Sequence, residues 1–63
     1  MKVKYEGKIG SYSFQLTDAN TIEIWGFDDS RPESFIYLKE GAINSQKEFD
    51  TEISYWYMKN IFN

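Results

Sequence analysis

The chain has 63 residues, a formal net charge of −3 and a pI near 4.7. A chain this short has room for one sheet and one helix, so we expect a single domain over residues 1–63. Cysteine and histidine are absent, which excludes disulfides, thiolate chemistry, imidazole bases and the usual zinc ligands, and the mild acidity argues against wrapping of duplex DNA.

The N-terminal residues do not predict a targeting or membrane segment. They alternate charged and apolar side chains and lack the continuous apolar stretch of a signal peptide. No apolar run in the sequence reaches the length of about 18 residues that a membrane span needs. Because a chain without cysteine also suits a reducing compartment, we expect a cytoplasmic protein without membrane contact.

Residues 2–9 predict the first strand, because apolar and charged side chains alternate along them as in a half-buried strand. Gly10 and Ser11 follow, and glycine in the first of two loop positions suits a type II′ hairpin turn. This turn pairs Ile9 with Tyr12, Gly7 with Phe14 and Tyr5 with Leu16. The side of the first strand that faces the core then carries Val3, Tyr5, Gly7 and Ile9.

A second turn over residues 18–20 predicts a third strand that starts at Thr21. Asn20 tolerates the left-handed conformation that closes a three-residue hairpin loop. The resulting register sets Leu16 opposite Ile22 and Phe14 opposite Ile24. The outer face of this strand then carries Thr21, Glu23, Trp25 and Phe27, unless a bulge at Gly26 turns Phe27 inward.

Residues 35–38 predict a fourth strand, after a polar loop that contains Pro32. Both faces of this strand are apolar, so its alternation does not fix its orientation. We expect Ile36 and Leu38 to point inward and Phe35 and Tyr37 to point outward.

Residues 45–62 predict one helix. Ser45 and Glu48 have the spacing of a capping box, in which each side chain accepts a hydrogen bond from the backbone N–H of the other. Within an arc of roughly 140° lie the side chains expected to cover the sheet: Phe49, Ile53, Trp56, Tyr57 and Ile61. The predicted fold class is therefore α+β, a four-stranded antiparallel meander with one C-terminal helix packed on one face, in the order β-β-β-β-α.

The sequence contains no motif that predicts catalysis. It has no phosphate-binding loop, no dinucleotide-binding glycine pattern and no nucleophile elbow. Asp28, Asp29 and Glu33 crowd one loop with oxygen ligands that suit a divalent cation, but Arg31 among them and the lack of EF-hand spacing favour a solvated turn. We therefore expect no enzyme, no catalytic residue, no metal site and no cofactor.

The aromatic content is the most informative functional signal, with two Trp, five Tyr and five Phe in the chain. A two-layer core accounts for about half of these rings. The others fall on the outer face of the sheet and on the back of the helix, together with one methionine: Trp25, Phe27, Phe35, Tyr37, Tyr55, Met58 and Phe62. Because aromatic residues and methionine are enriched in interfaces, we expect these residues to bind a protein partner in a small, homodimeric interaction module.

Two alternatives remain open. In the first, the fourth strand or a bulge at Gly26 turns some of these rings inward, and the others are ordinary scattered surface residues. In the second, lysines of the first strand and rings of the outer face form a platform for single-stranded nucleic acid or a small ligand. Glu6 and Glu23 on the same face oppose this platform, and lysine on an edge strand commonly serves to block sheet pairing.

Overall fold

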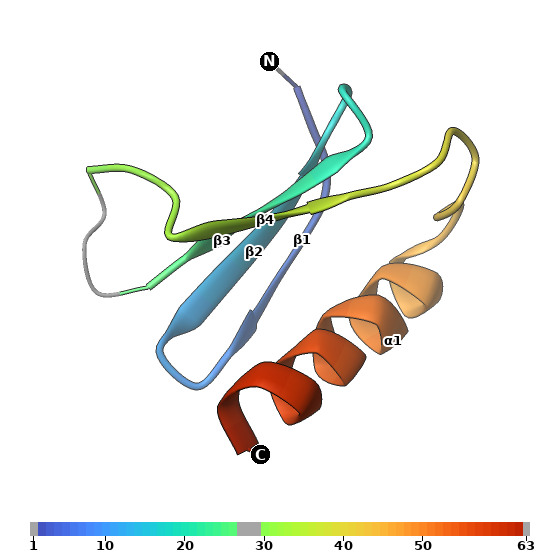
Figure 1. Cartoon of the computed structure of the whole chain (residues 1–63). Coiled ribbons are helices and arrows are strands. Elements are labelled where there is room, and N and C mark those ends of the chain that lie inside the picture. The colour runs from blue at the N-terminus through green and yellow to red at the C-terminus, as the bar shows by residue number, and fades with distance from the viewer. Residues whose placement is uncertain (1, 27–29, 63) are drawn as a thin grey trace.

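The computed structural model describes residues 2–26 and 30–62 (Figure 1). It confirms the predicted α+β meander, in which four antiparallel strands form one sheet in the order β1-β2-β3-β4 and a C-terminal helix follows. The strands β1 and β4 are the edges of this sheet. The elements are β1 Val3–Ile9, β2 Tyr12–Thr17, β3 Thr21–Trp25, β4 Ser34–Tyr37, α1 Gln46–Tyr57 and a π-helical turn over Met58–Phe62 that continues α1.

The predicted registers of both hairpins are confirmed. Gly10 and Asn20 have φ angles of 59° and 57°, in the left-handed region that glycine and asparagine tolerate best. These turns align the inward residues of neighbouring strands. The first hairpin pairs Ile9 with Tyr12, Gly7 with Phe14 and Tyr5 with Leu16, and the second pairs Phe14 with Ile24 and Leu16 with Ile22.

The first residues of β1 depart from the prediction. A register shift between Val3 and Tyr5 inserts Lys4 as an extra residue and sets Val3 opposite Thr17. Because directly opposed residues share a face, Val3 leaves the side of Tyr5, and its side chain is exposed. The inward position predicted for Val3 is therefore wrong, and the cause is a bulge at the start of the strand.

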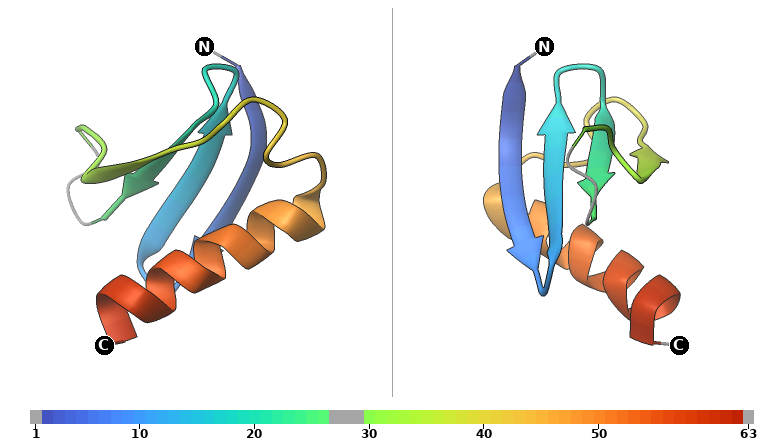
Figure 2. Two further views of the ribbon diagram at one scale, coloured as in Figure 1. Left: turned by 45° about the vertical axis from the view of Figure 1, so that its right-hand side comes forward. Right: turned by 90° about the vertical axis from the view of Figure 1, so that its left-hand side faces the viewer.

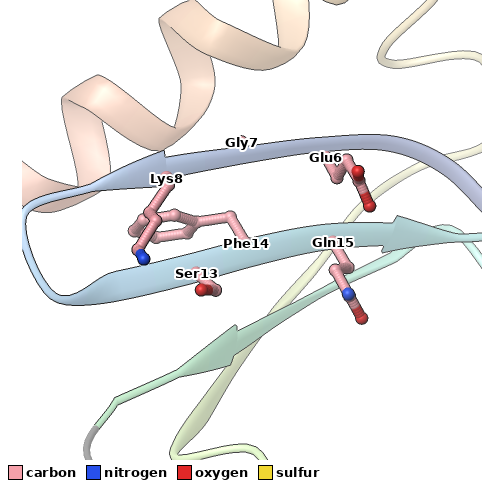
Figure 3. A pocket seen from close by; sticks show the side chains of 6 residues that line it. All are labelled: Glu6, Gly7, Lys8, Ser13, Phe14 and Gln15. Carbon is pink, nitrogen blue, oxygen red and sulfur yellow. The ribbon is translucent and has the colours of Figure 1, made fainter.

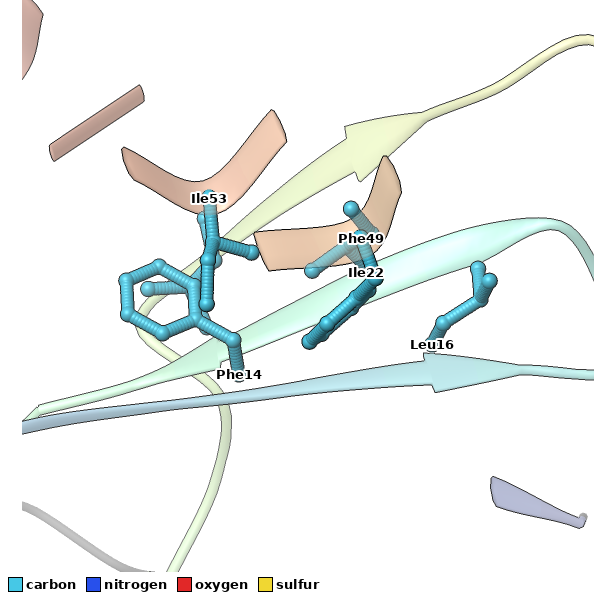
Figure 4. Packing of buried hydrophobic residues seen from close by; sticks show 6 residues of the cluster. Phe14, Leu16, Ile22, Phe49 and Ile53 are labelled. Carbon is cyan, nitrogen blue, oxygen red and sulfur yellow. The ribbon is translucent and has the colours of Figure 1, made fainter. Parts of the chain in front are cut away.

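The core lies between the sheet and α1, which covers one face of the sheet (Figures 1 and 2). Figure 4 shows side chains of the helix and of the strands meeting in this layer. The buried apolar residues are Phe14, Leu16, Ile22, Ile24, Phe49 and Ile53. Ile36 and Leu38 pack against this cluster, whereas Phe35 and Tyr37 are exposed. The predicted orientation of the fourth strand is thus confirmed.

The helix lies close to β1 because Gly7 has no side chain. A Cβ atom at Gly7 would stand 2.9 Å from Cδ1 of Ile53 and 3.3 Å from Cε2 of Phe49, closer than a well-packed core accepts. Gln46 adds a polar link, since its Nε2 donates to the backbone carbonyl of Glu6 at 3.1 Å and to Oδ1 of Asp50 at 2.8 Å. These contacts hold the first turns of α1 over the edge strand.

The helix begins where the capping pattern predicts. Ser45 is extended, with φ −153° and ψ 160°, and its Oγ accepts a hydrogen bond from the backbone N–H of Glu48 at 3.1 Å. The carboxylate of Glu48 accepts instead from the backbone N–H of Asn44, at 2.6 Å. The predicted return bond to Ser45 is therefore wrong by one residue, because the Glu48 side chain reaches past the cap residue to the preceding amide.

The end of the helix also differs from the prediction. The ring of Tyr57 already lies at the β1–β2 turn, with its hydroxyl 3.1 Å from the position of a Cβ at Gly10. The residues after Tyr57 extend past the ends of the strands (Figure 2). Ile61 is consequently exposed, and its predicted place in the stripe that covers the sheet is wrong.

Candidate interaction surfaces

The side of the helix that faces away from the sheet carries an apolar groove. Tyr55, Met58 and Phe62 are 65%, 60% and 76% exposed. Together with Lys59 they line a hollow of about 510 Å³, and we refer to these four residues as the helix groove. The structure therefore brings together the three helix residues that the sequence pattern predicts for a partner surface.

Lys59 also lines the groove, although it is not among the residues predicted for the partner surface. Its Nζ lies 5.9 Å from the centroid of the Tyr55 ring, which is within the range of a cation–π contact. The spacing of four residues between Tyr55 and Lys59 places both on one face of a helix, so this spacing in the sequence indicates that Lys59 lies beside the groove. The groove thus has a positive charge at its border.

Phe62 is held in place by the last aromatic residue of the core layer. Its ring meets that of Tyr57 edge to face, with centroids 5.9 Å apart and an interplanar angle of 84°. Tyr57 in turn packs edge to face against Tyr12 of β2. The groove is therefore connected to the sheet through one half-buried tyrosine.

A second exposed aromatic pair lies on the outer face of the sheet, on β4. The rings of Phe35 and Tyr37 stack with centroids 6.1 Å apart and an interplanar angle of 21°. Phe35 is 44% exposed and Tyr37 is 78% exposed. Since the helix covers the inner face, this pair and the helix groove lie on opposite sides of the two-layer structure.

Trp25 differs from these two rings. It lies on the outer face opposite Ser13, as predicted, but its side chain is only partly exposed. Its indole Nε1 is buried and has no hydrogen-bond partner within the described part of the chain. Phe27, which was also predicted for this surface, lies outside the described residues, as do Asp28 and Asp29.

A smaller hollow of about 350 Å³ lies along β1 and β2 (Figure 3). Its lining residues are Glu6, Gly7, Lys8, Ser13, Phe14 and Gln15. Within residues 2–26 and 30–62, no group of three or more carboxylates has the spacing of a metal site. Glu6 and Lys8 bring opposite charges to the hollow. The hollow is therefore not uniformly basic, unlike a groove that follows a nucleic-acid backbone.

Comparison with known proteins yields no match: no protein-family model, no curated protein and no solved structure is similar to the chain. Among the described residues, no helix is long and apolar enough to cross a membrane. The function is therefore inferred from the surfaces alone.

Proposed function

We propose that the protein is a small, non-enzymatic interaction module that forms a homodimer and acts by binding a protein partner in the cytoplasm. The observation that carries this proposal is the grouping of exposed large apolar side chains into two patches, the helix groove and the Phe35–Tyr37 pair. Single exposed apolar residues are ordinary on protein surfaces, but contiguous groups usually mark an interface.

The composition of the helix groove supports a protein as its ligand. Tyrosine, phenylalanine and methionine are enriched in the centre of protein interfaces, where they fill pockets of the partner. Lys59 is the charged residue that lines the groove, so a complementary partner presents an apolar segment with a carboxylate beside this lysine.

The mass of the protein in solution, measured as a function of concentration, is the first test of the proposed homodimer. We expect sedimentation equilibrium to give an average mass that rises with concentration, from the monomer towards twice that mass, between micromolar and millimolar chain. Self-association also stabilises a small core by mass action, so the midpoint of thermal unfolding should rise over the same range. A mass that stays at the monomer value up to millimolar concentration contradicts the homodimer.

A photo-reactive side chain at position 58 tests binding of a different protein at the groove. The matched control carries the same group at position 47, an exposed lysine near the start of the same helix. A protein captured from position 58 only is purified and titrated against the wild type and Met58→Lys. We expect binding to the variant to be weaker by about tenfold or more, and equal affinities contradict a role of the groove.

One observation favours a second candidate, a platform for single-stranded nucleic acid. The strand pairing places Lys8, Ser13 and Trp25 in one row across the outer face, which sets a cation near an aromatic ring. The next row brings Glu6 and Glu23 to the same face, and their negative charges oppose binding of a nucleic acid.

A fluorescence titration tests this candidate. In a Trp56→Phe background, an oligonucleotide should quench Trp25 fluorescence, and binding should weaken as salt rises. Unchanged fluorescence at low salt rules this candidate out.

A further inference from the structure

The two edge strands of the sheet differ in how their free backbone groups are protected. On β1 the bulge at Lys4 interrupts the strand, Glu6 and Lys8 are exposed charges, and Gln46 donates to the Glu6 carbonyl at 3.1 Å. Bulges, charged side chains and covering groups are the means by which proteins keep an edge strand from pairing. Strand β4 has the sequence SFIY and carries no charge, so it is the edge that is open to a partner.

The hydrogen bonds between β3 and β4 show which groups of β4 are free. The N–H of Leu38 donates to the carbonyl of Asn20 at 2.9 Å, and hydrogen-bonded pairs recur at every second residue of an antiparallel ladder. Ile36 therefore bonds to β3, and the N–H and C=O groups of Phe35 and Tyr37 point away from it. Within the described residues nothing bonds to these outward groups.

We propose that β4 pairs with β4 of a second copy of the chain, antiparallel and about a two-fold axis at Ile36. The two four-stranded sheets then form one continuous sheet. In this register Phe35 of each copy lies opposite Tyr37 of the other, and each such pair exchanges two N–H···O=C bonds through the outward groups. The edge is complementary to itself, as a symmetric dimer requires.

The charges that flank β4 fit the same register. Glu33 lies three residues before Ile36 and Lys39 three residues after it. Both lie just outside β4, and the N–H of Glu33 donates to the Ile24 carbonyl at 2.7 Å, so the ladder is irregular there. The antiparallel pairing still brings each Glu33 to the same end of the interface as the Lys39 of the other copy. Both side chains are exposed, and neither forms an ion pair within the described residues. In the single chain the Glu33 carboxylate lies against Gly26, so this pairing requires a rotation of an exposed side chain.

Other positions of the axis lose this match. A shift of the pairing by one residue sets the outward groups of one strand against inward groups of the other. A shift by two residues keeps the hydrogen bonds in phase but moves Glu33 away from Lys39, to a position opposite Tyr37 or Gly41 depending on the direction of the shift. With the axis at Ile36, the stacked Phe35–Tyr37 pairs of the two copies also meet on the outer face as neighbouring cross-strand rings.

This inference rests on the proposed homodimer and adds its interface. Strand β4 has four residues, so the contact is small, below about 1,200 Å² in total, which is the range of weak and reversible complexes. We expect a dissociation constant on the order of micromolar to tens of micromolar.

Removal of one outward donor tests the interface. Tyr37→Pro deletes an N–H that points to the free edge and leaves the hydrogen bonds to β3 in place. We expect sedimentation equilibrium to show a dissociation constant at least about tenfold higher. Met58→Lys, which changes the helix groove, is the matched control and should leave the constant within about twofold, because it lies on the opposite side of the molecule. Circular dichroism verifies that both variants are folded.

Charge exchange tests the register without proline. Glu33→Lys and Lys39→Glu each set like charges opposite one another in the dimer, and each should weaken it several-fold at low salt. The double variant restores opposite charges and should return the dissociation constant to within about twofold of the wild type. This recovery decides the question even if Tyr37→Pro does not fold.

The outcomes separate the interface from the homodimer itself. If the wild type stays monomeric at millimolar concentration, the homodimer is wrong. A second outcome is that the wild type dimerises, that Met58→Lys weakens the dimer, and that Tyr37→Pro and the charge variants leave its dissociation constant unchanged. In that case the β4 interface is wrong and the homodimer stands. In the supporting outcome, exchange of the Phe35 and Tyr37 amide protons also slows as concentration rises, whereas exchange of the Lys8 amide does not.

Discussion

The two halves of α1 and its terminal turn have opposite roles. The docked half, residues 46–53, begins with the Ser45 cap, is tied to β1 by Gln46 and buries Phe49 and Ile53 completely. The free half, residues 54–62, contains no fully buried residue and ends in a π-helical turn. A single helix thus supplies the core with one half and an exposed apolar groove with the other.

The difference comes from what lies beneath each half. The docked half stands over the sheet, where Gly7 allows a close approach. At the boundary, Trp56 meets Phe14 edge to face at 5.7 Å between ring centroids, and Tyr57 lies at the first hairpin turn. Within residues 2–26 and 30–62, no strand lies beyond that turn to cover the helix. The exposure of Ile61 therefore depends on how far the sheet extends, whereas Tyr55 and Met58 are exposed because they lie on the side of the helix that faces away from the sheet.

The largest expected effect is loss of a core ring from the docked half. Phe49→Ala should lower the free energy of unfolding by about 3–5 kcal/mol, which is comparable to the roughly 3–9 kcal/mol expected for a chain of this size. Phe62→Ala, in the free half, should cost less than about 1 kcal/mol, because it loses one edge-to-face contact with Tyr57. Urea denaturation measures both. Equal losses would mean that the two halves are equally part of the core.

The close approach at Gly7 should give the next effect. Gly7→Ala places a methyl group against Cδ1 of Ile53, and we expect a loss of about 1–2 kcal/mol in urea denaturation. The same substitution in an Ile53→Val background, which lacks Cδ1, should cost less by about 0.5 kcal/mol or more. A cost that is the same in both backgrounds would place the strain elsewhere.

Loss of the helix cap should have a smaller effect. Ser45→Ala removes the acceptor of the Glu48 N–H and should cost about 1 kcal/mol, which corresponds to a drop of about 4–8 °C in the thermal midpoint of a small domain. The control is Asn60→Ala, which removes the bond from Nδ2 of Asn60 to the Trp56 carbonyl in the free half. This exposed bond should contribute less than about 0.5 kcal/mol, so a similar drop for both variants contradicts the comparison.

The smallest effect is expected in the groove itself. Met58→Lys should change the free energy of unfolding by no more than about 0.5 kcal/mol, because the side chain is largely exposed in the monomer. The measurement is made at a chain concentration below that at which the wild type associates. A large loss would show that the groove supports the fold and is not reserved for a partner.

The parts of the fold that follow from local chemistry were predictable from the sequence. Gly10 and Asn20 define their turns by backbone conformation, and the alternation on either side of each turn then fixes the pairing. The groove residues Tyr55, Met58 and Phe62 were predictable for a similar reason, since their angular positions place them opposite the residues that face the sheet.

The parts that depend on distant neighbours were not predictable. The alternation through Lys4 is regular, so nothing in it signals the bulge that exposes Val3. The exposure of Ile61 depends on where the sheet ends, and the alternation along the third strand does not signal the partial burial of Trp25. The spacing of Lys59 from Tyr55 was present in the sequence, but a lysine in the last turn is also explained by the helix dipole.

The hydrogen bond from Gln46 to the Glu6 carbonyl has a consequence for the size of any assembly. In the proposed dimer, the bulge at Lys4, the exposed charges and this bond protect β1, so each copy has one open sheet edge and the two open edges pair with each other. We therefore expect the proposed association through β4 to stop at two chains. If β1 were also open, the β4 of one copy would add to the β1 of the next, and such head-to-tail addition does not close and leads to fibres. In the proposed dimer, a glutamine in the first turn of the helix thus contributes to limiting growth by way of the opposite edge of the sheet.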